Sequence, residues 1–192
     1  QLVRSDIRSD PATGAVSAGA PLVLTFNVTQ VANGACTPLE GATVDVWHCD
    51  AEGVYSDVGS AQGQKFLRGS QVTDAHGVAQ FTTIYPGWYP GRTVHIHFKI
   101  HPDSTSVFTS QLFFDDDFTD QVFTQEPYAS RGERNTRNGN DGIYDDQLLM
   151  RVSQDGQGYA ANFDIGIDPT TLGGGQSGGP GRGGPGLPPP RP

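Results

Sequence analysis

Apolar and polar side chains alternate along several short segments of this chain. Residues 22–29 carry an apolar side chain at almost every second position, and residues 42–49 repeat the pattern. Successive side chains of an extended strand point to opposite faces, so this alternation predicts strands with one buried and one polar face. Two further segments are rich in β-branched and aromatic residues, which strands favour. The expected strands are residues 22–29, 42–49, 78–84, 94–100, 111–114 and 161–167.

Helical periodicity is weak by comparison. No segment of ten or more residues repeats apolar positions at the spacing of a helix face. The fold class that follows is all-β, with a β-sandwich core, long loops and little helix. The stretch from Phe118 to Asp146 is long and polar, and long loops in compact domains often carry function. Its segment Asn138–Asp141 lacks the spacing of a Ca²⁺ loop and is expected to form an acidic surface.

Composition divides the chain into two parts. Of its 26 Gly and 14 Pro residues, 9 Gly and 6 Pro lie in residues 173–192. Such a segment cannot bury a core, so we expect a flexible tail or linker there, which would connect to any further module. Residues 1–172 are expected to form one domain, because 192 residues are too few for two ordinary domains.

The net charge of −9 argues against partners that require a basic surface. Nucleic-acid binding draws its affinity from clustered Lys and Arg, and this chain has no basic stripe. It also lacks an apolar run near the roughly 20 residues that cross a bilayer. We therefore expect neither a nucleic acid nor a membrane as a partner.

The two cysteines suggest a compartment. Cys36 lies in a loop and Cys49 ends the apolar run that follows, so a disulfide would clip the loop to a strand end. Disulfides persist in oxidising environments, which predicts a secreted, extracellular protein. The alternative is two free thiols in a cytosolic protein.

A His-Ile-His sequence at residues 95–97 is the strongest candidate for chemistry. On a strand, His95 and His97 face the same side about 6.6 Å apart along the backbone, which suits the binding of one metal ion. Alone, the pair does not distinguish Zn or Cu from Fe. It is also consistent with histidines that bind no metal and are hydrogen-bonded or exposed. Arg92 would fall on the apolar face of a regular strand, so the strand should begin after Arg92.

Two tyrosines lie near the histidine pair in the sequence. Tyr89 occupies a Pro-Gly-rich bend six residues before His95, and Tyr55 follows the turn that begins at Asp50. A phenol has a pKa of about 10, so it becomes a good ligand only when a strongly acidic cation such as Fe(III) displaces its proton. Isolated tyrosines would simply pack at the bases of loops, but beside a histidine pair they favour a metal centre.

Three segments carry a family resemblance: Pro38–Asp50, Gly53–Ser56 and Pro86–Phe98. In them the sequence resembles the intradiol ring-cleaving dioxygenases of the catechol and protocatechuate type. The resemblance extends over nearly everything from Leu2 to about Asp168. It implies that the single domain is catalytic and that its long loops carry a metal site.

The resemblance also implies the roles of individual residues. Fe(III) would be held by Tyr55, Tyr89, His95 and His97, and the catalytic residues would be Arg92, Tyr89 and Gln111. Tyr89 would take up a substrate proton, and Arg92 would stabilise developing negative charge. The implied reaction inserts both atoms of O₂ into a catechol-type ring to give a cis,cis-muconate, without an organic cofactor.

Two other classes of function stay open. A non-catalytic, secreted β-sandwich binding module would explain the strands and the tail, but not the tyrosines beside the histidine pair. A Zn or Cu protein would use His95 and His97 alone. Colour separates these hypotheses, because tyrosinate-to-Fe(III) charge transfer is expected to make the protein red to burgundy, whereas a Zn site is colourless.

Overall fold

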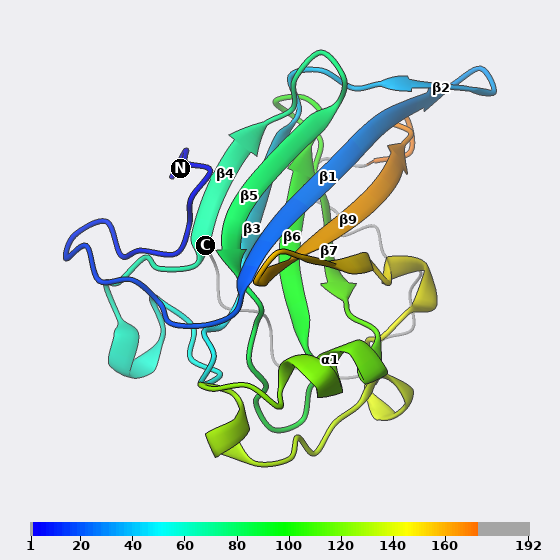
Figure 1. Ribbon diagram of the computed structural model, residues 1–192. Coiled ribbons are helices and arrows are strands. Elements are labelled where there is room, and N and C mark those ends of the chain that lie inside the picture. The colour runs from blue at the N-terminus through cyan, green and yellow to red at the C-terminus, as the bar shows by residue number, and fades with distance from the viewer. Residues whose placement is uncertain (1, 173–192) are drawn as a thin grey trace.

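The computed structural model describes residues 2–172, which form two β-sheets packed face to face, with loops gathered at one end (Figure 1). The strands are β1 (Pro21–Ala32), β2 (Ala35–Pro38), β3 (Thr43–Trp47), β4 (Arg68–Val72), β5 (Val78–Ile84), β6 (His95–His101), β7 (Phe108–Phe113), β8 (Arg151–Asp155) and β9 (Gly158–Ile167). The helices are α1 (Asp116–Val122) and the 3₁₀ turns η1 (Gly59–Ala61), η2 (Ala129–Arg131), η3 (Asn138–Asn140) and η4 (Asp146–Leu148). The tail expected at 173–192 lies outside the described residues.

Both sheets consist mainly of antiparallel neighbours. One sheet follows the order β2-β1-β9-β8, with β5 also paired to β1, and in it β1 and β9 run parallel. The other follows the order β4-β3-β6-β7, and its pairs are all antiparallel. The predicted all-β sandwich with little helix is confirmed, and each of the six expected segments overlaps a strand.

The core lies between the sheets and is formed by the apolar faces of their strands. The ring of Phe26 on β1 lies 5.5 Å from the ring of Phe98 on β6, so the two sheets are in direct contact there. Ile96 is fully buried in the same core. Side chains alternate along a strand, so the neighbours of Ile96 on β6 project from the opposite, outer face of the sheet. The buried positions of β1 are those that the alternation predicted: Leu22, Leu24, Phe26 and Val28.

Three strands and one helix lack a sequence pattern that would reveal them. β4 shows no apolar alternation because it buries two polar side chains, Arg68 and Ser70, each 5% exposed. β2 and β8 are largely exposed on both faces. The seven residues of α1 are too few for a helical period, and Asp115 begins this helix by accepting a hydrogen bond from the Phe118 N–H at 3.0 Å. No described helix is long and apolar enough to cross a membrane.

The predicted disulfide between Cys36 and Cys49 is wrong, because both cysteines are free. Cys36 is exposed on β2, in the hairpin that extends away from the sandwich (Figure 1). Cys49 is buried beyond the far end of β3, where its thiol donates a hydrogen bond to the Gly87 carbonyl at 3.4 Å. The intervening chain runs the whole length of β3, so it carries the two sulfurs to opposite ends of that strand. Spacing along the sequence did not reveal this separation.

Tyr128 ties the start of β1 to the loop after β5. Its buried hydroxyl donates to the Tyr85 carbonyl and accepts from the Ala20 N–H at 3.0 Å. Tyr128→Phe would leave both backbone groups unpaired in the interior, so we expect the free energy of unfolding to fall by about 1–3 kcal/mol. Chemical denaturation measures this change, with Tyr144→Phe at a less buried position as the control. Equal stability of the two variants would contradict the expectation.

Candidate metal centre

The four candidate ligands come together from three segments of the chain. His95 and His97 project from the outer face of β6, because the residue between them packs into the core. β6 begins at His95, which confirms that the strand starts after Arg92. Tyr55 lies in the loop after β3, and Tyr89 lies in the loop between β5 and β6.

The ends of these four side chains converge on one point. The Tyr55 hydroxyl lies 3.3 Å from the Tyr89 hydroxyl and 3.2 and 3.1 Å from the Nε2 atoms of the two histidines. Tyr89 Oη lies 3.0 Å from His95 Nε2, and the two Nε2 atoms are 3.1 Å apart. Atoms that bind one metal ion at roughly 2 Å each are spaced roughly 3 Å from one another. The spacing of the four atoms fits a single metal ion.

Hydrogen bonding at His95 also favours a cation. Its Nδ1 lies 2.7 Å from the Thr93 carbonyl, an acceptor, so Nδ1 carries the proton and Nε2 presents its lone pair. Three atoms surround that single lone pair: the hydroxyls of Tyr55 and Tyr89, and Nε2 of His97. One lone pair cannot accept a hydrogen bond from all three. A cation at the centre would instead use one lone pair from each of the four side chains.

Burial sets the protonation states of these groups. Burial, followed by the charge of Arg92, lowers the pKa of His95 to about 3. Burial also lowers the pKa of His97 well below its ordinary value, with His95 and Arg92 adding to the effect. The pKa values of Tyr55 and Tyr89 are raised, chiefly by burial. Both imidazoles are therefore neutral and ready to bind a metal, whereas each phenol must lose its proton to the metal.

Within the described part of the chain, the histidine pair has no alternative set of His, Cys, Asp or Glu ligands. Among residues 2–172, no group of three or more His, Cys, Asp and Glu side chains is placed to hold a metal ion. This finding excludes, within those residues, the arrangement of two histidines and one carboxylate that ferrous oxygenases use. A metal bound at His95 and His97 would therefore have the two phenols as its neighbours.

Arg92 and Gln111 lie beside the same cluster. Gln111 on β7 pairs with His97 in the β6–β7 register, which directs both side chains to the outer face. Arg92 bridges to Tyr89 across a tight turn and donates from Nη2 to Gln111 Oε1. The structure thus brings the expected catalytic residues and the expected ligands into one site.

A family model described as Dioxygenase matches residues 5–168, which is most of the chain. The protocatechuate 3,4-dioxygenase beta chain of Burkholderia cepacia is 30% identical over 177 residues, covering 82% of this chain and 69% of that protein. The chain belongs to the intradiol ring-cleavage dioxygenase family. The family resemblance of the three sequence segments is therefore confirmed.

Members of this family with solved structures share the fold. The intradiol ring-cleavage dioxygenase from Tetranychus urticae has a TM-score of 0.77 at 29% identity, covering 88% of each chain. The dioxygenase domain of a dioxygenase carbohydrate-binding protein fusion from Streptomyces sp. SirexAA-E has a TM-score of 0.66 at 33% identity, covering 88% of this chain and 89% of that chain. The chain spans less than two-fifths of the length of the chlorocatechol 1,2-dioxygenase of Pseudomonas putida.

The two tyrosine-bearing loops are held against each other and against the sheet. Arg68 on β4 donates from Nε to the Ser56 hydroxyl at 2.9 Å and from Nη2 to the Ser56 carbonyl at 2.7 Å. Gly53 has a φ of +82°, and a Cβ atom there would lie 2.5 Å from the Trp88 carbonyl oxygen. Glycine is therefore required where the loop of Tyr55 passes the residue next to Tyr89. No sequence pattern indicates the buried arginine of β4, which anchors the loop of Tyr55 through Ser56.

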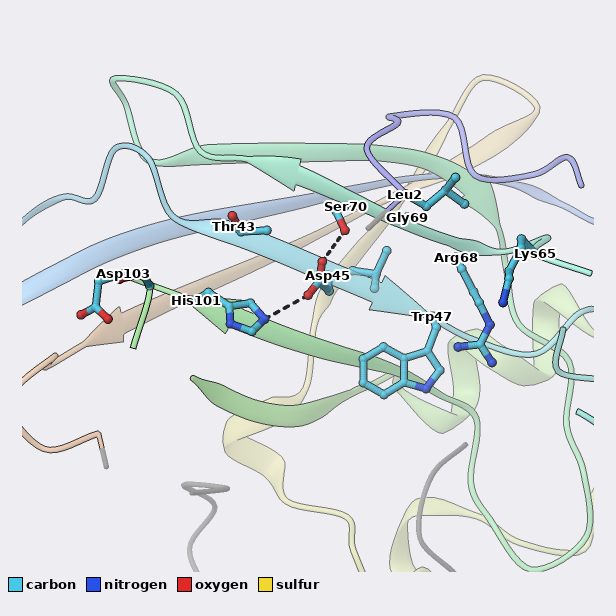
Figure 2. Close-up of a pocket in the computed structure, with 12 residues that line it drawn as sticks. Leu2, Thr43, Asp45, Trp47, Lys65, Arg68, Gly69, Ser70, His101 and Asp103 are labelled. Atoms are coloured by element: carbon cyan, nitrogen blue, oxygen red, sulfur yellow. Dashed lines mark hydrogen bonds and ion pairs between the residues drawn. The ribbon is translucent and has the colours of Figure 1, made fainter. Parts of the chain in front are cut away.

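Trp47 links the metal centre to a neighbouring cavity. Its ring stacks on His97 at 5.1 Å and 6°. The cavity, of about 730 Å³, lies on the outer face of the sheet and is lined in part by Trp47. Figure 2 shows Asp45 in this cavity, where its carboxylate is hydrogen-bonded to the Ser70 hydroxyl and, at 3.0 Å, to His101 Nε2. None of its described lining residues is a candidate ligand, so the cavity is a separate feature beside the metal centre.

The prediction that Asn138–Asp141 forms an acidic surface is wrong for Asp141. The side chain of Asp141 is 0% exposed and pairs with Arg92 Nε at 2.9 Å. The sequence placed this aspartate in a polar loop, and nothing in that pattern showed that the loop folds back onto the site. Its 49-residue separation from Arg92 explains why local spacing did not reveal the pair.

Proposed function

We propose that this chain is a non-haem, Fe(III)-dependent intradiol dioxygenase that converts a catechol-type ring and O₂ into a cis,cis-muconate. The observation that carries the proposal is the convergence of two phenol oxygens and two imidazole nitrogens. Each of these four candidate ligand atoms lies within 3.3 Å of another one. Hard phenolate oxygens favour ferric iron over ferrous iron. The names of the family relatives, catechol and protocatechuate dioxygenases, give further support.

The proposed reaction needs no organic cofactor, because catechol and O₂ together contain every atom of muconic acid. Iron(III), when bound, would supply a Lewis acid that draws electron density from the catecholate ring and opens it to attack by O₂. Tyr89 would accept a proton from a catechol hydroxyl, since its Oη already lies among the donor atoms. Arg92, held by Gln111, would stabilise negative charge that develops on the ring.

The proposal covers the catechol 1,2-type and the protocatechuate 3,4-type together. Relatives of both types match this chain, at 30% identity each. The candidate ligands, the proton acceptor Tyr89 and the cation Arg92 do not by themselves distinguish the two types. Oxygen uptake with catechol, protocatechuate and hydroxyquinol would assign the preferred substrate.

We further propose that the protein is extracellular and that its Gly/Pro-rich tail connects to another module. The free cysteines remove the disulfide that first suggested export. The Gly/Pro-rich composition of the tail supports only its role as a connection to another module. The fusion of a dioxygenase to a carbohydrate-binding protein in Streptomyces sp. SirexAA-E offers a precedent. Mass spectrometry of culture medium and of cell extract tests the location. Finding the chain only in cells would contradict export.

The central experiment combines colour with product analysis. We expect iron-loaded protein to show a broad visible band from tyrosinate-to-iron charge transfer, and Zn-loaded protein to show none. With catechol, oxygen uptake should match the amount of cis,cis-muconate identified by mass. Iron-loaded, folded protein without a visible band and without ring opening would support a binding module or a Zn or Cu protein instead.

A further inference from the structure

The polar loop between η2 and β8 forms hydrogen bonds with the segment that contains Arg92. Asn135 Oδ1 accepts a hydrogen bond from the Gly91 N–H at 3.3 Å. Asn138 Oδ1 accepts one from the Thr93 hydroxyl at 2.6 Å. The backbone on both sides of Arg92 is therefore held by side chains that lie 44 and 45 residues later in the chain.

Asp141, in the same loop, makes the most extensive contacts. Its Oδ2 accepts from Arg92 Nε at 2.9 Å and from the Thr93 N–H at 2.8 Å. Its Oδ1 accepts from the N–H groups of Ile143 and Tyr144 at 2.7 and 3.0 Å. Burial alone would raise the pKa of Asp141, but these hydrogen bonds and the charge of Arg92 hold that pKa below its ordinary value. The buried carboxylate is therefore ionised and fixed in one orientation.

Both hydrogen-bond partners of Asp141 Oδ2, Arg92 and Thr93, contact residues of the metal centre. The Arg92 guanidinium donates from Nη2 to Gln111, which lies opposite His97 in the sheet. The Thr93 carbonyl accepts the Nδ1 proton of His95 at 2.7 Å. A single carboxylate oxygen thus sets both the direction of the guanidinium and the position of the carbonyl that orients a candidate ligand.

We infer that Asp141 is a positioning residue for ring cleavage. It aims Arg92 at the negative charge of the substrate and holds Thr93 where its carbonyl fixes the tautomer and orientation of His95. This inference rests on the proposed function. It also gives a role to the long polar loop, which would otherwise be a surface connection between α1 and β8.

Asp141→Asn tests the inference, because it keeps the shape of the side chain but removes its charge and part of its accepting capacity. We expect kcat/KM for catechol to fall by about 10–100-fold, mainly through kcat, as outer partners of a metal site commonly show. Iron content and the presence of the visible band should be retained. Asp146→Asn, which neutralises an exposed aspartate in the same loop, should retain activity within about twofold.

A double-mutant cycle separates positioning of Arg92 from a purely structural role. If Asp141 acts mainly through Arg92, then Asp141→Asn should change kcat/KM by less than about threefold in an Arg92→Gln background. Arg92→Lys keeps the positive charge but loses the planar guanidinium fork, so it should be impaired to about the same extent as Asp141→Asn. Arg92→Lys also serves as the second variant if Asp141→Asn does not fold.

Three results would overturn the inference. Wild-type activity in either Asp141→Asn or Arg92→Lys would show that the aim of the guanidinium is unimportant. A full additive loss in the Arg92→Gln background would show that Asp141 acts independently of Arg92, which removes the aiming of Arg92 that the inference requires. Absence of ring cleavage in the iron-loaded wild type would remove the proposed function, and this inference with it. The first two results would leave the proposed function standing.

Discussion

The His97→Gln variant should fold, bind iron at least about 100-fold more weakly than wild type, and lose measurable ring cleavage. Loss of even an outer partner of a metal ligand commonly costs 10–100-fold in affinity, so removal of a ligand should cost more. His97 Nε2 lies 3.1 Å from both His95 Nε2 and Tyr55 Oη, so glutamine would disturb the centre of the cluster. Metal analysis after dialysis, the visible spectrum and oxygen uptake would measure the loss.

His101→Gln is the matched control for that variant. His101 lies on the same strand and the same face, four residues along, but its Nε2 contacts Asp45 at 3.0 Å rather than the candidate ligands. We expect this variant to keep its iron and its activity. Iron retention and normal turnover in His97→Gln would contradict the assignment of His97 as a ligand, whereas equal losses in both variants would point to damage to β6.

Tyr89→Phe is expected to retain part of its iron but to lose most of its turnover, by about 100-fold or more in kcat. Three of the four donor atoms remain, so the metal still has a partial site. The variant lacks the phenolate that would accept the substrate proton, and a positioned acid or base contributes about 10²–10⁴-fold to rate. The ring of Tyr89 keeps its edge contact with Tyr55, at 5.7 Å, because phenylalanine has the same ring.

Stopped-flow measurement of catechol binding and of oxygen consumption would locate the defect in Tyr89→Phe. We expect the variant to bind catechol but to open the ring slowly. Tyr144→Phe, whose ring packs on Phe113 at 5.1 Å outside the cluster, should behave as wild type. A rate of ring opening unchanged by Tyr89→Phe would show that this phenol is not the proton acceptor.

Much of the fold could be predicted from local patterns. The period-two alternation of β1, with Leu22 and Leu24 buried in the core, follows from the geometry of an extended chain. The same geometry places His95 and His97 together on one face of β6. Strands without that alternation could not be found in this way, because Arg68 and Ser70 of β4 are polar and yet buried by the segments that cover them.

Tertiary contacts explain the two main errors. Cys36 and Cys49 are close in sequence, but β3 separates them in space, and only the arrangement of the strands shows this. Asp141 looked like part of an acidic surface, whereas the loop that carries it returns to Arg92 and buries the carboxylate. In both cases separation in the sequence did not indicate distance in space. The chain between the two cysteines is held extended by β3, whereas the chain between Arg92 and Asp141 folds back.

Local sequence patterns are sufficient to predict the strand faces, the position of two histidines on one face, and the kinds of ligand atom near them. Side-chain alternation and ligand chemistry depend on neighbouring residues, so they can be read locally. Packing of distant segments is needed to bring the hydroxyls of Tyr55 and Tyr89 to 3.3 Å from each other and to place Asp141 against Arg92. Those contacts join segments 34 and 49 residues apart, and they depend on how the sheets and loops pack.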